Sequence, residues 1–360
     1  MIDIKLRPKS VDKAMKKGMT LIELITVIFI GSLLISMTFL VYTNSSRSML
    51  RQDVIMEQLL NLRAGLAAIS RDIRGVGNGF SLLGLGQGQT IMAYTKDQNG
   101  DPVAWFRYPN ADGVTPPFGI APVYAMDGGA SGTDRLFVAS LSPDFSAPLG
   151  QLTNPLRPGD SSIKLTGALE IPTGVDIREL AKENDYLAVV PTSGLPVLIE
   201  VAEDPTALEE IHIKAMPGGD FPDGSTHMPG GSVVYNVKSV VFHGYAIGTQ
   251  ASTNETFLTL STLDSENDIM AEGIEDLQVA YCFGSDDPAI LANYDQDFSG
   301  LNTTSSSIKT IRLVLVSRTH RHDPYGKTFA RIEALNHTTL AAPDNYPRRF
   351  LETSVQLRNY

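Results

Sequence analysis

The stretch KKGMTLIELITVIFIGSLLISMTFLVY, residues 16–42, decides the architecture of this 360-residue chain. Sixteen of the 22 residues from 21 to 42 are apolar, and Glu23 is the only charged residue among them. A helix rises about 1.5 Å per residue, so 22 residues extend about 33 Å, close to the roughly 30 Å hydrocarbon core of a bilayer. The stretch therefore predicts a membrane-spanning helix over 21–42.

The charges on either side of this helix predict its orientation. Residues 1–18 carry six Lys or Arg and two Asp, a net charge of +4. The whole chain carries −11, so residues 19–360 carry −15. Basic residues flank the cytoplasmic end of membrane helices, which places the N-terminus in the cytoplasm and the rest on the periplasmic side.

The overall composition excludes several other classes of protein. An acidic chain with no basic, aromatic-rich patch does not fit nucleic-acid binding. A single cysteine, Cys282, excludes an internal disulfide framework and a thiolate-rich metal site. With 42% hydrophobic and 19% charged residues, the chain is globular overall.

Glu23 helps to decide between the possible explanations for the apolar segment. A secretory signal has a shorter apolar core and a small-residue cleavage site, which FLVYTNSS at 39–46 does not supply. A simple membrane anchor fits the hydropathy but does not explain a carboxylate, which costs about 2.5–3.5 kcal/mol at the centre of a membrane helix and less near its end. If the chain is cut after Gly18, the new amine of Met19 lies one helical turn from Glu23 and could pair with it.

The basic leader, the glycine and the Thr-Leu-Ile-Glu that follow resemble the processing signature of type IV prepilins and pseudopilins. Gly18, Met19, Thr20 and Glu23 match that pattern, with Met19 where phenylalanine is commoner. The resemblance implies cleavage between Gly18 and Met19 by prepilin peptidase. It also implies N-methylation of Met19 and a role of Thr20 and Glu23 in filament assembly.

The helical pattern continues beyond the membrane segment. Apolar residues recur at spacings of three and four, the signature of one helix face that packs against a globular head: Ile55, Leu59, Leu62, Leu66, Ile69 and Ile73. No proline occurs between Pro8 and Pro102, and glycines follow from residue 75. We predict one helix from about 20 to 75.

Gly31 lies in the middle of the membrane segment. One interpretation is a small residue that lets another helix approach closely. The other is a weak point where the helix unwinds during filament packing, as the resemblance to pilins implies. The sequence leaves both open.

Short strand-like segments separated by turn residues follow residue 79. They are 91–95, 103–108, 135–140, 186–190, 196–201, 209–214, 232–242, 256–260, 274–283, 308–317 and 350–358. We therefore predict a pilin-like α+β fold, with a leader at 1–18 and a long helix at 19–75. The head, 76–360, would be a mainly antiparallel sheet in one or two subdomains.

Local similarities narrow the family. The segments 47–80, 274–287, 308–319 and 348–360 resemble the helix end, two late strands and the C-terminal strand of PilW-type minor pilins, whereas 80–270 resembles nothing in particular. The alternative is the J-type minor pseudopilin of type II secretion, which shares the helix and the Arg-Asp-Ile segment but usually has a shorter head.

The sequence of the head contains no clear pattern for catalysis or metal binding. His320 and His322 would share one face of a strand but have only Asp323 nearby, which favours surface residues over a metal site. The acidic loops DQNGD, 97–101, and NYDQDFSG, 293–300, do not follow the calcium-loop pattern. No nucleophile elbow or phosphate loop is present. We expect no enzyme activity, no cofactor and no metal.

These features together, with the resemblance, predict a non-enzymatic minor pilin that primes or caps type IV pilus assembly. Its expected partners are other minor and major pilin subunits, prepilin peptidase, the inner-membrane assembly platform and membrane lipid, with no nucleic acid. It would reside in the inner membrane with its head in the periplasm and then in a pilus or pseudopilus. A membrane-anchored periplasmic binding or adhesin module is a further alternative.

Overall fold

The computed structural model divides the chain into two compact units, Met1–Met56 and Glu57–Tyr360. The residues that it describes are 20–77, 79–80, 83, 90–97, 101–108, 119–128, 132–141, 148–167, 181–207, 209–250, 252–253, 255–263, 268–283, 294–295, 308–319, 328, 335 and 344–357. The predicted leader, 1–18, and Met19 lie outside the described residues.

One helix, α1 (Leu21–Gly75), begins in the first unit and ends in the second. It ends where the sequence predicts, with Arg74 in its last turn and Gly77 at a φ of 71°. The hydroxyl groups within its apolar half donate to the helix's own carbonyls, as Thr26 does to Ile22 and Ser36 to Ser32, both at 2.8 Å. The hydroxyl donors of Thr26 and Ser36 are therefore satisfied within the helix, as an apolar environment requires.

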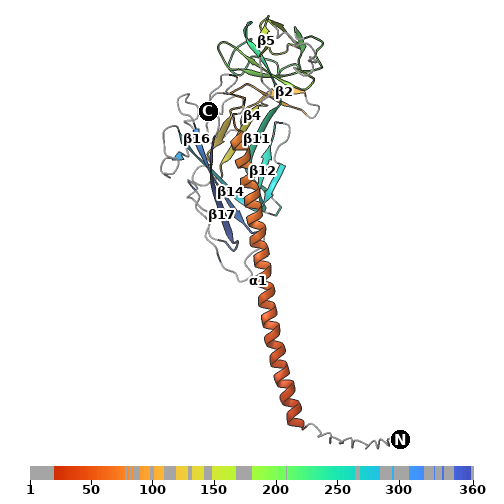
Figure 1. The fold of residues 1–360 in the computed structure, drawn as a ribbon, viewed down its shortest axis with the longest axis vertical. Helices are drawn as coiled ribbons and strands as arrows, with labels where there is room; N and C mark the ends of the chain where they lie inside the picture. The colour runs from red at the N-terminus through yellow and green to blue at the C-terminus, as the bar shows by residue number, and fades with distance from the viewer. Residues whose placement is uncertain are drawn as a thin grey trace, which may run out of the picture. The chain divides into compact units, whose positions relative to one another are not determined.

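Two antiparallel sheets make up the body of the second unit (Figure 1). In spatial order, the five-stranded sheet consists of β13 (Asp268–Glu272), β12 (Glu255–Ser261), β11 (Val240–Gln250), β4 (Arg135–Leu141) and β3 (Val123–Met126). The four-stranded sheet consists of β15 (Tyr294–Asp295), β14 (Ile274–Phe283), β16 (Ile308–Arg318) and β17 (Arg348–Gln356). Buried residues of both sheets share one apolar cluster with the C-terminal half of α1.

Six further strands, which lie between β4 and β11 in the chain, form a small barrel. In spatial order they are β8 (Val197–Glu200), β7 (Tyr186–Val190), β10 (Val233–Lys238), β5 (Pro148–Leu152), β6 (Ser162–Thr166) and β9 (Glu210–His212). The ring closes where Lys214 N donates to Glu200 O at 2.8 Å and Ala202 N donates to His212 O at 2.9 Å. Closure leaves no free sheet edge along this seam.

The barrel is an insertion in a continuous sheet. β4 ends and β11 begins side by side, since Leu141 pairs with Val240. The barrel has its own apolar core, and a third, aromatic-rich cluster joins barrel residues such as Leu198 to body residues such as Phe137. A two-stranded hairpin of β1 (Tyr94–Lys96) and β2 (Pro102–Trp105) adds Tyr94 to the barrel core.

The predicted fold class, one long helix with a mainly antiparallel sheet head, is confirmed. One strand assignment is wrong: the segment 232–242 is two strands, β10 and β11, which belong to different sheets. The break falls at Ser239, directly after Lys238, the last residue of β10, whose φ of 50° turns the chain out of the extended conformation. The sequence also missed β3, β5, β6, β13 and β15.

Candidate functional site

At the start of α1, Thr20 and Glu23 cap the helix by hydrogen bonds that run in both directions between them. The Glu23 Oε2 atom accepts hydrogen bonds from the Thr20 amide at 2.8 Å and from the Thr20 hydroxyl at 3.0 Å. The Thr20 hydroxyl oxygen accepts a bond from the Glu23 amide at 3.3 Å. This is the capping box in which two otherwise unsatisfied main-chain donors are paired. The pattern Thr-x-x-Glu before an apolar run is a signal that could have predicted it.

The cap leaves part of the Glu23 carboxylate available. Both bonds from Thr20 go to Oε2, and Oε1 accepts no hydrogen bond from the described part of the chain. The pairing of Glu23 with the amine of Met19 stays a prediction, because Gly18 and Met19 lie outside the described residues. The carboxylate can thus cap the helix with one oxygen and offer the other to a cation.

The apolar half of α1 has an exposed surface. Leu21, Phe29 and Phe39 expose 77%, 66% and 67% of their surface, and the most apolar 18-residue window of the helix has no buried residue. By length and composition alone, this helix could cross a membrane. Large apolar side chains exposed together along one element mark a surface that contacts lipid or other apolar helices.

Gly31 lies within the uninterrupted helix. A Cβ atom added there would have no atom of a described residue within 4 Å, so no contact with the described part of the chain requires glycine. Close approach of a second helix and local unwinding therefore both stay predictions.

The C-terminal half of α1 packs on the body. Of the predicted packing residues, Leu62, Ile69 and Ile73 have no exposed surface, and Leu66 packs against the same cluster. Leu59 is partly exposed, and Ile55, also partly exposed, belongs to the first unit.

Gly65 is a packing residue that the sequence reasoning missed. A Cβ atom there would lie 3.0 Å from Leu258 Cδ2 and 3.4 Å from Leu315 Cδ1. The helix therefore lies so close to the two sheets at this point that a side chain larger than that of glycine would be crowded. Its spacing from Leu62 and Ile69 puts it on the same helix face, which is the signal that could have identified it.

Polar contacts fix the last turns of α1 to β11. The Asp72 Oδ2 atom accepts hydrogen bonds from the Tyr245 hydroxyl and from the His243 ring through Nδ1. Burial raises the pKa of Asp72, but the hydrogen bonds from His243 and Tyr245 outweigh it, so the pKa lies below its ordinary value. Asp72 belongs to the Arg-Asp-Ile segment, and its role here is to hold the helix end in register on the sheet.

The described residues include no candidate metal site. No group of three His, Cys, Asp or Glu in the part of the chain that the structure describes could hold a metal ion. His320, His322, Asp323 and most of both acidic loops lie outside that part. Cys282 is a buried thiol.

Comparison with known proteins identifies a family for part of the chain. Residues 244–359 match the family model described as Type IV Pilus-assembly protein W. A type IV-like pilin from Thermus thermophilus is 15% identical over 50% of this chain and 90% of that chain, with a TM-score of 0.22, which is too low to support an argument. No curated protein matches the chain. The match confirms the resemblance to PilW-type proteins over the C-terminal third of the chain.

Proposed function

We propose that this PilW-like chain is a non-enzymatic minor pilin. It is held in the inner membrane by residues 21–42, with its N-terminus in the cytoplasm and its head in the periplasm. Prepilin peptidase cuts after Gly18, Met19 is methylated, and the subunit then helps to prime or cap a pilus. The observation that carries the proposal is the Thr20–Glu23 cap at the start of an exposed apolar helix, in a chain whose C-terminal third matches a pilus-assembly family.

The proposed mechanism rests on the surface of the helix. An apolar helix surface is stable in lipid and equally stable among other apolar helices, so transfer from the membrane to a filament costs little free energy. Glu23 alone among residues 21–42 is charged. Its carboxylate would pair with a methylated amine, and a charge pair in apolar surroundings is geometrically demanding, so it would fix the register of the helices.

Substitutions at Glu23 separate its two roles. Gln at this position keeps the capping box, which accepts Glu or Gln, but removes the charge. If the charge sets the register, Glu23→Gln and Glu23→Ala should both be processed normally. Both should also lower the number of surface pili at least about tenfold, the effect of losing about 1.4 kcal/mol.

Pili are counted by electron microscopy and processing is followed by the mass of the subunit. Thr26→Ala removes a hydroxyl group that bonds only the helix's own Ile22 carbonyl and leaves Glu23 and its cap unchanged, so it is the matched control and should assemble close to wild type. Normal piliation with Glu23→Gln would show that the carboxylate serves only as a cap.

A further inference from the structure

Three polar side chains meet at the seam where the barrel closes, and the proposed assembly mechanism uses none of them. Asn184 lies two residues before β7, Glu200 ends β8 and Lys214 lies two residues after β9. The Lys214 Nζ atom donates hydrogen bonds to Glu200 Oε1 at 2.8 Å and to Asn184 Oδ1 at 3.3 Å. An amine nitrogen is thus held against both a carboxamide and a carboxylate, the groups that a new amide bond between two side chains requires.

The main chain fixes the positions of these side chains. Asn184 N donates to Val201 O at 3.0 Å, and Lys214 N donates to Glu200 O at 2.8 Å, so the end of β8 is bonded to both neighbouring segments. Asn184 has a φ of 65°, in the left-handed region that asparagine adopts more readily than most residues. The amine and the carboxamide therefore stay close together, which raises the rate of a reaction between them.

Glu200 is a buried carboxylate that two lysines share. Its side chain is 2% exposed, and Lys96 Nζ, from β1, lies 2.8 Å from Glu200 Oε2, on the other side from Lys214. Burial lowers the pKa of Lys96, but the contacts with Glu200 and Tyr186 outweigh burial and hold this pKa above its ordinary value. Lys96 therefore stays charged and balances Glu200 by itself, so the charge balance of the cluster does not depend on Lys214.

We propose that Lys214 and Asn184 form an isopeptide bond that closes the barrel covalently. Lys214 Nζ passes a proton to Glu200 and attacks Asn184 Cγ, which is one C=O bond, about 1.2 Å, from the Oδ1 atom that it contacts. The Asn184 Cγ–Nδ2 bond then breaks. Glu200 relays two of the three ammonium protons of Lys214 to the leaving nitrogen, which departs as ammonium, and the third proton stays on the new amide.

The surroundings of Asn184 suit this reaction. Asn184 is exposed, so the released ammonium reaches solvent and the reverse reaction is suppressed by dilution. The bond joins the segment before β7 to the segment after β9, across β8. This seam otherwise closes through main-chain hydrogen bonds, as between Ala202 N and His212 O at 2.9 Å, so the bond makes the ring of strands covalent. It is independent of pilus assembly.

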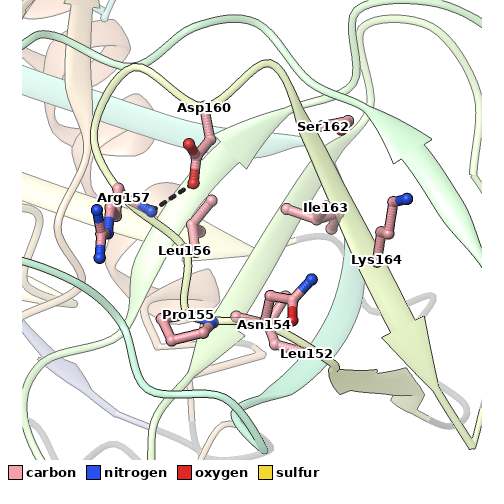
Figure 2. Close-up of a pocket in the computed structure, with 9 residues that line it drawn as sticks. All are labelled: Leu152, Asn154, Pro155, Leu156, Arg157, Asp160, Ser162, Ile163 and Lys164. Atoms are coloured by element: carbon pink, nitrogen blue, oxygen red, sulfur yellow. Dashed lines mark hydrogen bonds between the residues drawn. The ribbon is translucent and has the colours of Figure 1, made fainter.

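A second Lys–Glu pair in the barrel provides a comparison. Lys164 Nζ lies 3.8 Å from Glu210 Oε1, and the two side chains are 56% and 47% exposed. Figure 2 shows the Lys164 side chain on the opposite side of a concavity from Arg157, and pointing away from it. Water surrounds this exposed pair and screens it. We therefore expect Lys164 to form no covalent bond.

The test is the peptide masses of the full chain, purified in detergent. Trypsin cuts an unlinked chain after Lys182 and Lys214, and residues 183–214 contain no other Lys or Arg. A linked Lys214 is not cut. We expect one peptide that covers residues 183–238 and is lighter than its sequence by about 17 Da, the mass of one ammonia molecule. A peptide of unmodified mass that ends at Lys214 would overturn the proposal.

A second digestion separates the link from cyclisation of Asn184 with its own main chain, which also releases ammonia. Cleavage after glutamate divides this region at Glu183, Glu200, Glu210 and Glu255. The bond predicts that residues 184–200 and 211–255 remain one species. Two separate peptides, with the loss of ammonia on 184–200, would contradict the bond.

Variants assign the roles of the three residues. Lys214→Arg keeps the positive charge but removes the amine, and Glu200→Gln keeps the shape but removes the proton relay, so both should abolish the link. Lys164→Arg, in the comparison pair, is the matched control and should keep it. Circular dichroism checks that all three fold. A loss of ammonia that persists in folded Lys214→Arg would overturn the proposal, and a link that persists in folded Glu200→Gln would contradict the relay.

Discussion

Asp134 is a carboxyl group with no exposed surface in the body of the second unit. Its oxygens accept hydrogen bonds from the Val279 amide at 2.7 Å and the Gly128 amide at 2.9 Å, so it ties the segment before β4 to β14. Burial raises its pKa to about 7, and nearby Asp127 and Asp276 act in the same direction. This carboxyl group is therefore largely protonated in mildly acidic solution.

The raised pKa of Asp134 predicts the sign of a pH effect on stability. Between pH 4 and 7 the unfolded chain loses this proton while the folded chain keeps it, so the free energy of unfolding falls as pH rises. The loss is at most about 4 kcal/mol for a shift of about three pH units. Urea unfolding followed by circular dichroism, at pH 4.5 and pH 7.5, measures it.

Asp134→Asn isolates this effect from those of other groups, such as Asp72, whose lowered pKa acts in the opposite direction. The stability difference between wild type and Asp134→Asn should shrink as pH rises, because only wild type loses the proton. A difference that stays constant between the two pH values would mean that Asp134 is ionised throughout.

At the scale of the element, the contact between α1 and the sheets depends on Gly65. Valine at this position would force the helix away from Leu258 and Leu315 and should destabilise the second unit by about 1–3 kcal/mol. Ala64→Val, at the neighbouring exposed residue, is the control and should cost no more than about 0.7 kcal/mol through helix propensity. Urea unfolding gives both values, and equal effects would contradict close packing at Gly65.

The helix could be predicted from the sequence because its signals are local. Periodic apolar residues, the absence of proline and a terminal glycine run lie within one continuous segment, and the predicted end at residue 75 agrees with the end of α1. The processing motif is also local, so Gly18, Met19, Thr20 and Glu23 could be proposed as the assembly site from their order in the chain alone.

The head could be predicted only in outline because its sheets join distant segments. The segment 232–242 was predicted as one strand instead of β10 and β11, because nothing in the sequence indicates the positive φ of Lys238. β5, with the sequence Pro-Leu-Gly-Gln-Leu, lacks the β-branched residues that identify strands. The contacts of Asp72 with His243 and Tyr245 cross about 170 residues of chain, and Lys214 meets Asn184 and Glu200 only in the closed barrel.

At the scale of the whole molecule, the second unit has separate cores. One lies beneath α1 and includes Leu313, and another fills the barrel and includes Ile163. The chain's single tryptophan, Trp105, packs against the barrel core and contacts Phe221, so its fluorescence reports on the barrel. An inserted barrel with its own core can unfold apart from the sheet into which it is inserted.

Two core truncations test this independence. Ile163→Ala should destabilise the barrel by about 2–5 kcal/mol and shift the urea transition of Trp105 fluorescence. It should leave the hydrogen exchange of the β14 and β16 amides unchanged. Leu313→Ala should instead speed the hydrogen exchange of the β14 and β16 amides and leave the urea transition of Trp105 fluorescence unchanged. If each variant shifts both signals equally, the barrel and the body unfold as one unit.

The central claim is that this chain is a prepilin whose leader is removed before it acts. The most direct measurement is the N-terminal peptide mass of the protein isolated from cells with an active prepilin peptidase. We predict a chain that begins with N-methylated Met19, and a Gly18→Val variant that keeps residues 1–18. A wild-type chain that begins at Met1, or is cut elsewhere than after Gly18, would contradict the account.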